Sequence, residues 1–135
     1  MSAFVDTNVV VYAFDSGDPE KQRIAIGVLE SARRLVVSTQ VLLETWWVLT
    51  RRLERPLSED VAAEVIDKLS RLPVVTTDTE LVGRAIATSR RFGLAVWDAL
   101  IVEAARSSGC DRVLTEDLQA GQEFDGVVVE NPFAG

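Results

Sequence analysis

Four acidic residues, Asp6, Glu44, Asp98 and Asp117, border short apolar runs that are far apart in the chain. If they converge in the fold, a small domain cannot tolerate their buried charge without a compensating cation. Oxygen ligands without His or Cys favour Mg²⁺ or Mn²⁺. A metal held in this way can bind a scissile phosphate and lower the pKa of an attacking water. The residue types therefore predict metal-assisted hydrolysis of a phosphate ester.

The elements expected around these residues bring them to one edge. Asp6 directly follows the apolar run Ala3-Phe4-Val5, and Asp117 comes just after the run Val113-Leu114. The carboxyl ends of parallel strands share one edge of a sheet, where α/β proteins bind ligands. Glu44 borders the apolar stripe of one expected helix, and Asp98 lies on the inward face of another, in its first turn.

Each acidic residue also has a plainer interpretation. Asp6 could be a turn residue that bonds the backbone of Asn8, and Asp98 could be a helix N-cap. Glu44 could be a solvated helix charge, and Asp117 could cap a short helix after Thr115. Each residue alone is weak evidence, and the joint placement favours a shared site.

Short apolar runs alternate with longer amphipathic ones, which is typical of crossover units on a largely parallel sheet. We expect a three-layer α/β/α sandwich with a mainly parallel central sheet, formed by a single domain over residues 1–135. The strands are predicted at 3–5, 35–37, 73–75, 112–114 and 127–129, with a short helix or loop between the last two. The helices are predicted at about 18–33, 38–54, 58–72, 77–92 and 97–108.

The composition excludes several function classes. The chain has no histidine, so His-dependent nucleophiles and His-zinc sites are ruled out. Its one cysteine, Cys110, forms no internal disulfide, which suits a reducing compartment, and we expect it to be a buried filler. The 135 residues carry 14 basic and 21 acidic side chains, a net charge of −7, which argues against binding to nucleic acid or membrane by bulk charge. Without an apolar stretch of about 20 residues, we expect no membrane association and a cytoplasmic location.

Several motifs resemble those of PIN domains. The opening Phe4-Val5-Asp6-Thr7-Asn8 is similar to the family's first strand, which ends in Asp-Thr-Asn. Three later segments of this chain resemble the family's later acidic motifs in the same order: Val41-Leu42-Leu43-Glu44, Trp97-Asp98-Ala99-Leu100 and Thr115-Glu116-Asp117. The resemblance covers essentially the whole chain, and its size suits the VapC-type toxins of toxin-antitoxin pairs.

The resemblance implies a divalent-metal-dependent endoribonuclease that leaves a 5′-phosphate and a 3′-hydroxyl. On this basis Asp6, Glu44, Asp98 and Asp117 are the catalytic and metal-binding carboxylates, with Asn8 and Thr115 as polar supports. Some relatives carry another acid two residues after the fourth, where this chain has Gln119, so the number of metal ions stays open.

The resemblance also implies an RNA substrate, a cognate antitoxin that covers the site, and a homodimer. The Trp-rich apolar helix 41–53 agrees with a dimer, since a small domain has little room to bury three tryptophans. Trp46, Trp47 and Trp97 could instead stack bases or pack in the core. The clusters that could flank RNA are Arg51, Arg52 and Arg55, or Arg84, Arg90 and Arg91, although exposed helix faces would explain most of them.

Two rivals remain. A phosphoacceptor receiver domain would need a lysine near a late strand, and the only lysines, Lys21 and Lys68, lie on early helices. A PIN-like module that binds RNA or protein without cutting is the second alternative, and the intact set of four acids argues against it.

Overall fold

A six-stranded sheet in the order β3-β2-β1-β4-β6-β5 organises the computed structural model, which describes residues 2–134. The strands are β1 (Ser2–Val5), β2 (Arg34–Ser38), β3 (Val74–Val75), β4 (Arg112–Leu114), β5 (Glu123–Phe124) and β6 (Val127–Glu130). All neighbouring pairs are parallel except β5 and β6, which are antiparallel. The α/β fold with a mainly parallel sheet is therefore confirmed.

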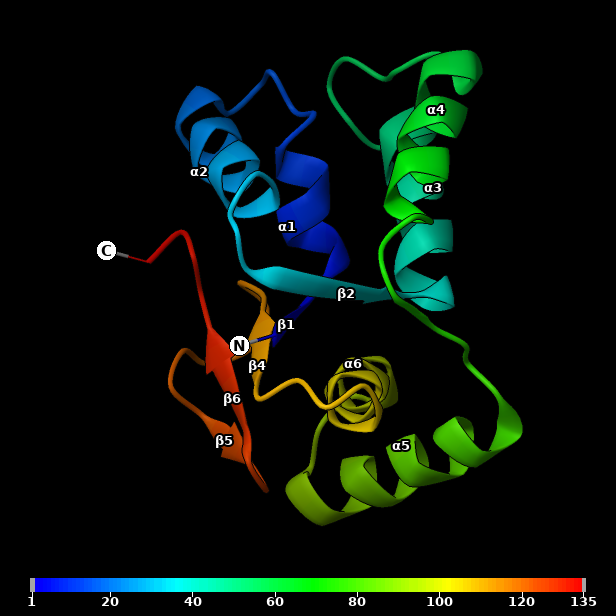
Figure 1. Ribbon diagram of the computed structural model, residues 1–135, viewed down its shortest axis with the longest axis vertical. Coiled ribbons are helices and arrows are strands. Elements are labelled where there is room, and N and C mark those ends of the chain that lie inside the picture. Colours follow the sequence, from blue (N-terminus) through cyan, green and yellow to red (C-terminus); the bar gives the residue numbers. More distant parts are fainter. Residues whose placement is uncertain (1, 135) are drawn as a thin grey trace.

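Within residues 2–134, six helices cover the two faces of the sheet. They are α1 (Thr7–Tyr12), α2 (Pro19–Leu29), α3 (Thr39–Arg51), α4 (Glu59–Leu69), α5 (Thr79–Phe92) and α6 (Val96–Ser107). Helices α1 to α4 lie on one side of the sheet, while α5 and α6 lie on the other (Figure 1). Helix α6 contacts β1, β4 and β6, and α5 packs along α6. The three layers match the predicted sandwich.

The direction of the chain across the sheet reverses between β1 and β4. From β1 the chain moves outward through β2 to β3, and it then crosses back to place β4 on the other side of β1. In open α/β sheets, the crevice at such a reversal, outside the carboxyl ends of the strands, is where ligands bind. Here that crevice lies between the ends of β1 and β4, where Asp6 and Thr115 follow.

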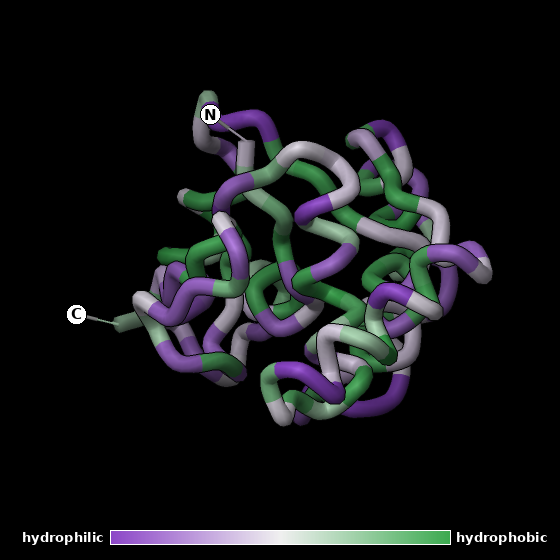
Figure 2. Tube along the Cα trace, turned by 90° about the horizontal axis from the view of Figure 1, so that it is seen from below, coloured by the Kyte–Doolittle hydropathy of each residue, from purple (hydrophilic) through white to green (hydrophobic). Residues whose placement is uncertain are grey.

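The core forms where the central strands meet the two helical layers. Phe4 of β1 pairs in register with Val36 of β2 and Val113 of β4, and none of the three is exposed. Cys110 is buried as predicted. Hydrophobic and hydrophilic residues alternate along helical parts of the trace (Figure 2), as in helices that turn one face inward, whereas α6 is buried all round from Ala99 to Ala105. None of the helices within residues 2–134 combines the length and apolar character that crossing a membrane requires.

Two elements were missing from the sequence prediction. Helix α1 starts immediately after Asp6 and contains three consecutive valines, Val9–Val11, which disfavour helix intrinsically; burial of those valines stabilises it here. Strand β5 forms a two-residue antiparallel ladder with β6, too short to leave an alternating pattern.

Several helix ends also differ from the prediction. Helix α2 ends at Leu29 instead of about Arg33, because the chain must bend before it enters β2. Helices α3 and α4 end at Arg51 and Leu69, each three residues early. Helix α5 begins at Thr79, two residues after the predicted start, because Asp78 caps it by accepting a bond from the Leu81 amide.

Candidate active site

Asp6 is the most enclosed of the four predicted carboxylates. It follows β1 and caps α1, where Oδ1 accepts a 2.7 Å bond from the Thr7 amide and Oδ2 accepts a 2.9 Å bond from the Thr115 hydroxyl. Only 7% of Asp6 is exposed. Burial raises the pKa of its carboxyl from the ordinary 3.8 to about 6, although both hydrogen bonds act to lower it, and the charges of Asp117 and Glu44 raise it further. The expected turn bond to the Asn8 backbone is replaced by the bond from Thr7.

Asn8 and Thr115 connect Asp6 to Asp117. The Asn8 Nδ2 lies 3.3 Å from Asp6 Oδ2, 3.0 Å from Thr115 Oγ1 and 3.0 Å from Asp117 Oδ2. The Thr115 hydroxyl donates to Asp6 and accepts from the Asp117 amide at 3.1 Å. The structure thus places both predicted supports between two of the predicted carboxylates. No helix follows Thr115, so the interpretation of Asp117 as a helix cap is wrong.

Glu44 reaches the same group from α3. Its Oε2 accepts a 3.0 Å bond from the Thr7 hydroxyl, and its Oε1 accepts a 2.7 Å bond from the Gln40 amide one turn earlier. Glu44 is exposed, as the plainer interpretation required, but it is anchored to the residue that follows Asp6. The bond from Thr7 holds the N-terminal part of α3 beside the end of β1.

Asp98 lies in the first turn of α6 and is half-buried. The N-cap of α6 is Ala95, so the interpretation of Asp98 as a cap is wrong. Among residues 2–134, no hydrogen-bond partner satisfies the Asp98 carboxylate. Burial raises the pKa of Asp98, and the charges of Asp117 and Glu44 raise it further. The charges of the other carboxylates therefore affect the pKa of Asp98, although Asp98 forms no hydrogen bond with them.

Three of the four predicted carboxylates, Asp6, Glu44 and Asp117, line an open cleft of about 360 Å³, and Asp98 is not among its lining residues. Within residues 2–134, none of the four predicted acids forms an ion pair with Lys or Arg. In the same part of the chain, no three acidic or cysteine side chains stand close enough together to hold a metal ion as they are. The oxygen-only donor set nevertheless fits Mg²⁺ or Mn²⁺, with side-chain rotation needed to bring the oxygens to ligand distance.

A second polar cluster beside the cleft was missed. The Tyr12 hydroxyl donates a 2.7 Å bond to Glu116, and the Lys21 ammonium lies 2.8 Å from the other oxygen of the same carboxylate. The bond to Glu116 is the main cause of a raised pKa for Lys21. A signal existed in the sequence: Glu116 stands between Thr115 and Asp117, so strand-like alternation would turn it away from them, toward α2.

The two predicted arginine clusters have different surroundings. On α5, Arg84 forms a 2.8 Å ion pair with Glu80, and Arg91 pairs with Asp125. At the end of α3, the Arg51 guanidinium lies 4.9 Å from the centre of the Trp47 ring, and Arg52 lines a cleft that also includes Glu44. The α3 cluster is therefore the one beside a predicted site carboxylate.

Comparisons with known proteins agree with this fold. The family model of the PIN domain matches residues 3–122. Solved structures with a similar fold include the Mycobacterium tuberculosis toxin VapC20, described as cleaving the sarcin-ricin loop, with a TM-score of 0.69 and 23% identity over 85% of this chain and 89% of that chain. A toxin-antitoxin complex from Klebsiella pneumoniae gives a TM-score of 0.71 and 18% identity over 97% and 98% of the two chains.

VapBC2 from Rickettsia felis, solved with a DNA fragment from its promoter, gives a TM-score of 0.65 and 18% identity over 97% and 98% of the two chains. The search of curated proteins finds no match. The match to the family model spans most of the sequence and includes the ends of β1 and β4, together with α3 and α6. The chain belongs to the PIN domain family.

Proposed function

We propose that this protein is a divalent-metal-dependent endoribonuclease, of the toxin type found in toxin-antitoxin pairs. One observation carries the proposal. Asp6, Glu44 and Asp117 line one cleft, Asp98 lies near enough for the charges of Asp117 and Glu44 to raise its pKa, and none of the four is paired with a Lys or Arg of residues 2–134. Two of them have raised pKa values, which is the electrostatic strain that a bound cation would relieve.

In this proposal Asp6, Asp117, Glu44 and Asp98 hold Mg²⁺ or Mn²⁺. The cation would polarise the scissile phosphate and lower the pKa of the attacking water. Asn8 and Thr115 keep Asp6 and Asp117 in place, which is the role that outer hydrogen-bond partners have in metal sites. Gln119 follows Asp117 without adding a carboxylate, so the chain supplies four acidic ligands for one or two ions.

An RNA cleavage assay tests the proposal. Purified protein is incubated with structured and unstructured RNA in Mg²⁺, in Mn²⁺ and in excess chelator. We expect cleavage only with metal, and fragments that carry a 5′-phosphate. Asp98→Asn should abolish cleavage, whereas Asp60→Asn, an exposed acid in the first turn of α4, should leave it unchanged. Undiminished cleavage in chelator, or by Asp98→Asn, would refute the metal site.

The alternative is a PIN-like module that binds RNA or protein without cutting. That module would bind RNA equally well with and without metal, and no condition would produce fragments. The same experiment, read by gel and by RNA binding, separates the two functions.

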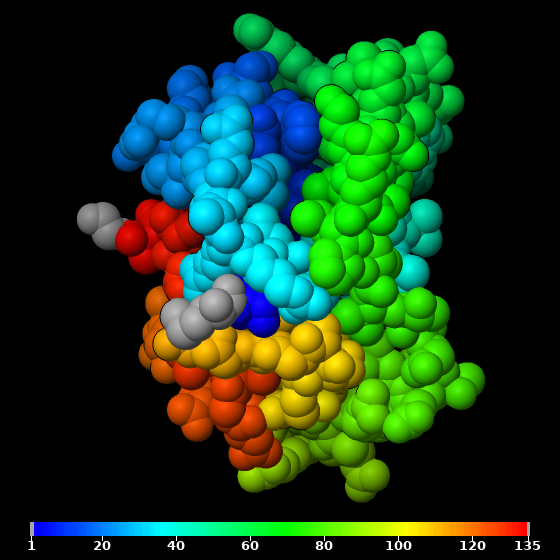
Figure 3. Space-filling view, in the orientation of Figure 1, coloured from blue at the N-terminus to red at the C-terminus, as the bar shows by residue number. Residues whose placement is uncertain are grey.

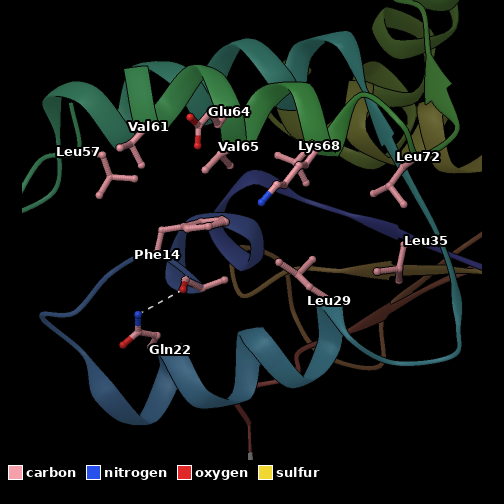
Figure 4. Close-up of a pocket in the computed structure, with 12 residues that line it drawn as sticks. Phe14, Gln22, Leu29, Leu35, Leu57, Val61, Glu64, Val65, Lys68 and Leu72 are labelled. Atoms are coloured by element: carbon pink, nitrogen blue, oxygen red, sulfur yellow. Dashed lines mark hydrogen bonds between the residues drawn. The ribbon is translucent and has the colours of Figure 1, made fainter. Parts of the chain in front are cut away.

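The proposed antitoxin has a candidate docking groove on the other side of α1. This hollow of about 660 Å³ lies between α2 and α4 (Figure 3), and Ala13 and Phe14, which follow α1, contribute to its lining. Figure 4 shows the apolar side chains that face each other across it: Leu57, Val61, Val65 and Leu72 on one side, and Phe14, Leu29 and Leu35 on the other. Since a related fold was solved as a toxin-antitoxin complex, we assign the groove to an apolar helix of the antitoxin.

Binding by the purified antitoxin, which this proposal expects to be encoded by a neighbouring gene, tests the groove. Val61 lines it and is 47% exposed, so Val61→Asp should abolish the complex without unfolding the toxin. Val82→Asp on α5, at a position with 42% exposure, is the matched control and should bind normally. Equal affinities for both variants would place the antitoxin elsewhere.

We also propose that the protein is a homodimer. An apolar cleft of about 610 Å³ between α3 and α4 is lined by Leu42, Leu43, Trp46 and Ile66, and Leu43 is 73% exposed. A second copy would cover this surface. Light scattering at tens of micromolar should give twice the chain mass for the wild type and a monomer for Ala63→Arg, which puts a charge into the cleft. Ala87→Arg on the exposed side of α5 should remain dimeric; a monomeric wild type would contradict the proposal.

A further inference from the structure

Two exposed tryptophans line a second cleft, which lies beside the carboxylate cleft. This hollow of about 580 Å³ is lined by Trp47 and Trp97 together with Gln40, Leu43, Glu44, Val48 and Arg52. Glu44 and Val48 also line the carboxylate cleft, so the two clefts are adjacent. Trp47 is 51% exposed and Trp97 is 67% exposed. Neither side chain is needed to fill the core.

Each tryptophan lies close along its helix to one predicted site carboxylate. Trp97 directly precedes Asp98 at the start of α6, and Trp47 lies one helical turn after Glu44 on α3. A group that contacts both indoles therefore lies beside Glu44, which lines the same cleft. Gln40 joins the two clefts as well, since it lines the tryptophan cleft and donates to Glu44 at 2.7 Å.

Positive charge flanks this cleft in a chain whose net charge is −7. The Arg51 guanidinium lies 4.9 Å from the centre of the Trp47 ring, and Arg52 lines the cleft. Flat aromatic faces with arginines beside them are what proteins use to bind unpaired nucleobases, which stack on the ring while the phosphate contacts the cation. An apolar protein partner would gain nothing from the arginines and would meet the charge of Glu44.

We propose that Trp47 and Trp97 form a subsite for an unpaired nucleobase beside the scissile phosphate of the RNA. This inference rests on the proposed ribonuclease function and deepens it. With the phosphate at the carboxylates, the neighbouring base enters the tryptophan cleft and stacks on the indoles. The enzyme then selects single-stranded or looped RNA, because a base held in a duplex cannot enter the cleft.

The test combines protein variants with a modified substrate. A short single-stranded RNA that the wild type cleaves is compared with the same RNA lacking the base next to the cut. In the wild type we expect base removal to lower kcat/KM about tenfold or more, mainly through KM, since base stacking on an aromatic side chain is worth roughly that factor. In Trp47→Ala and Trp97→Ala the intact RNA should be cleaved that much less well, and base removal should then have little further effect. Trp47→Phe and Trp97→Phe should retain most of the discrimination.

Ile86→Ala on α5 is the control, because Ile86 is an apolar side chain with 47% exposure that lies outside the cleft; its discrimination should equal that of the wild type. A second measurement does not depend on turnover. In a Trp46→Phe background with Ca²⁺ in place of Mg²⁺, the intact RNA should quench the tryptophan emission and the RNA lacking the base should not.

Three results would overturn the subsite. Full base discrimination in both alanine variants is the first, and unquenched emission on RNA binding is the second. A change of molecular mass in Trp47→Ala or Trp97→Ala with unchanged RNA kinetics is the third, and it would assign the cleft to a protein interface. In all three the wild type still cuts RNA, whereas failure of the ribonuclease proposal itself would appear as a wild type without any cleavage.

Discussion

Replacing Asp6 by Asn should stabilise the metal-free protein at neutral pH. The Asp6 carboxyl has its pKa raised from 3.8 to about 6 in the folded state, mainly by burial. Below pH 3.8 it is protonated in both the folded and the unfolded chain, so it has no effect on the free energy of unfolding. As the pH rises from 3.8 to 6, the unfolded chain releases its proton first and the folded state loses stability. Above pH 6 the whole loss remains.

The size of the effect follows from the pKa difference. At about 1.4 kcal/mol per pH unit, the buried charge destabilises the fold by about 3 kcal/mol at neutral pH. Asn keeps the bond from the Thr7 amide, but its own amide nitrogen faces Thr115 Oγ1 and Asn8 Nδ2, where the carboxylate accepted. That mismatch costs about 1 kcal/mol. The net gain is therefore about 2 kcal/mol, or roughly 7 °C in Tm for a chain of this length.

Denaturation in urea and chelator at pH 4.5, 6 and 7.5 measures this effect. We expect the difference between Asp6→Asn and the wild type to grow with pH and to favour the variant at pH 7.5. Asp78→Asn, which changes the cap of α5, should stay within about 0.5 kcal/mol of the wild type throughout. If Asp6→Asn is less stable by a constant amount at every pH, Asp6 is only a helix cap and the strained carboxylate site is wrong.

Three further outcomes follow from the same contacts. Millimolar Mg²⁺ should raise the Tm of the wild type by several degrees, because it binds only the folded state, and should not raise that of Asp98→Asn; equal shifts by calorimetry would exclude Asp98 as a ligand. Thr115→Val should lower the free energy of unfolding by about 2 to 4 kcal/mol in urea, since it leaves buried Asp6 without its hydroxyl donor; a loss below 1 kcal/mol would show that this hydroxyl is dispensable. Lys21→Met should lower the free energy of unfolding by less than about 1 kcal/mol, because the Lys21 side chain in its ion pair with Glu116 is about a third exposed. The difference from the wild type should vanish in 1 M salt. A larger loss that does not depend on salt would indicate that Lys21 stabilises the fold by packing.

Much of the fold follows from local sequence patterns. The apolar runs at Phe4 and Val113 form central strands because both faces of a parallel sheet are buried. Ser38 and Ser58 cap helices as their side chains predict, and Gly93 ends α5 with a φ of +69° that favours glycine. The convergence of Asp6 and Asp117 needed only the rule that strand ends share an edge.

The hydrogen-bond partners inside the site could not be predicted in the same way. Asn8 bonds Asp117, a residue 109 positions away, and no local pattern encodes which of several polar neighbours its amide selects. From the sequence, Asp98 could equally be a helix N-cap or an inward-facing residue of the first helical turn. Only the observed start of α6 at Val96 decides between these two roles. The Lys21 to Glu116 contact likewise depends on how α2 packs beside the end of β4.

The placement of β4 beside β1 has a consequence for synthesis of the protein on the ribosome. Asp6 is translated 109 residues before Thr115, whose hydroxyl completes its hydrogen-bonded surroundings, and Asp117 follows two residues later. A nascent chain that ends before β4 has the first carboxylate but neither the hydroxyl that orients it nor the fourth acid. The carboxylate site is therefore assembled only after β4 and the residues that follow it have been made, so a nascent chain that has not yet reached β4 cannot carry a complete site.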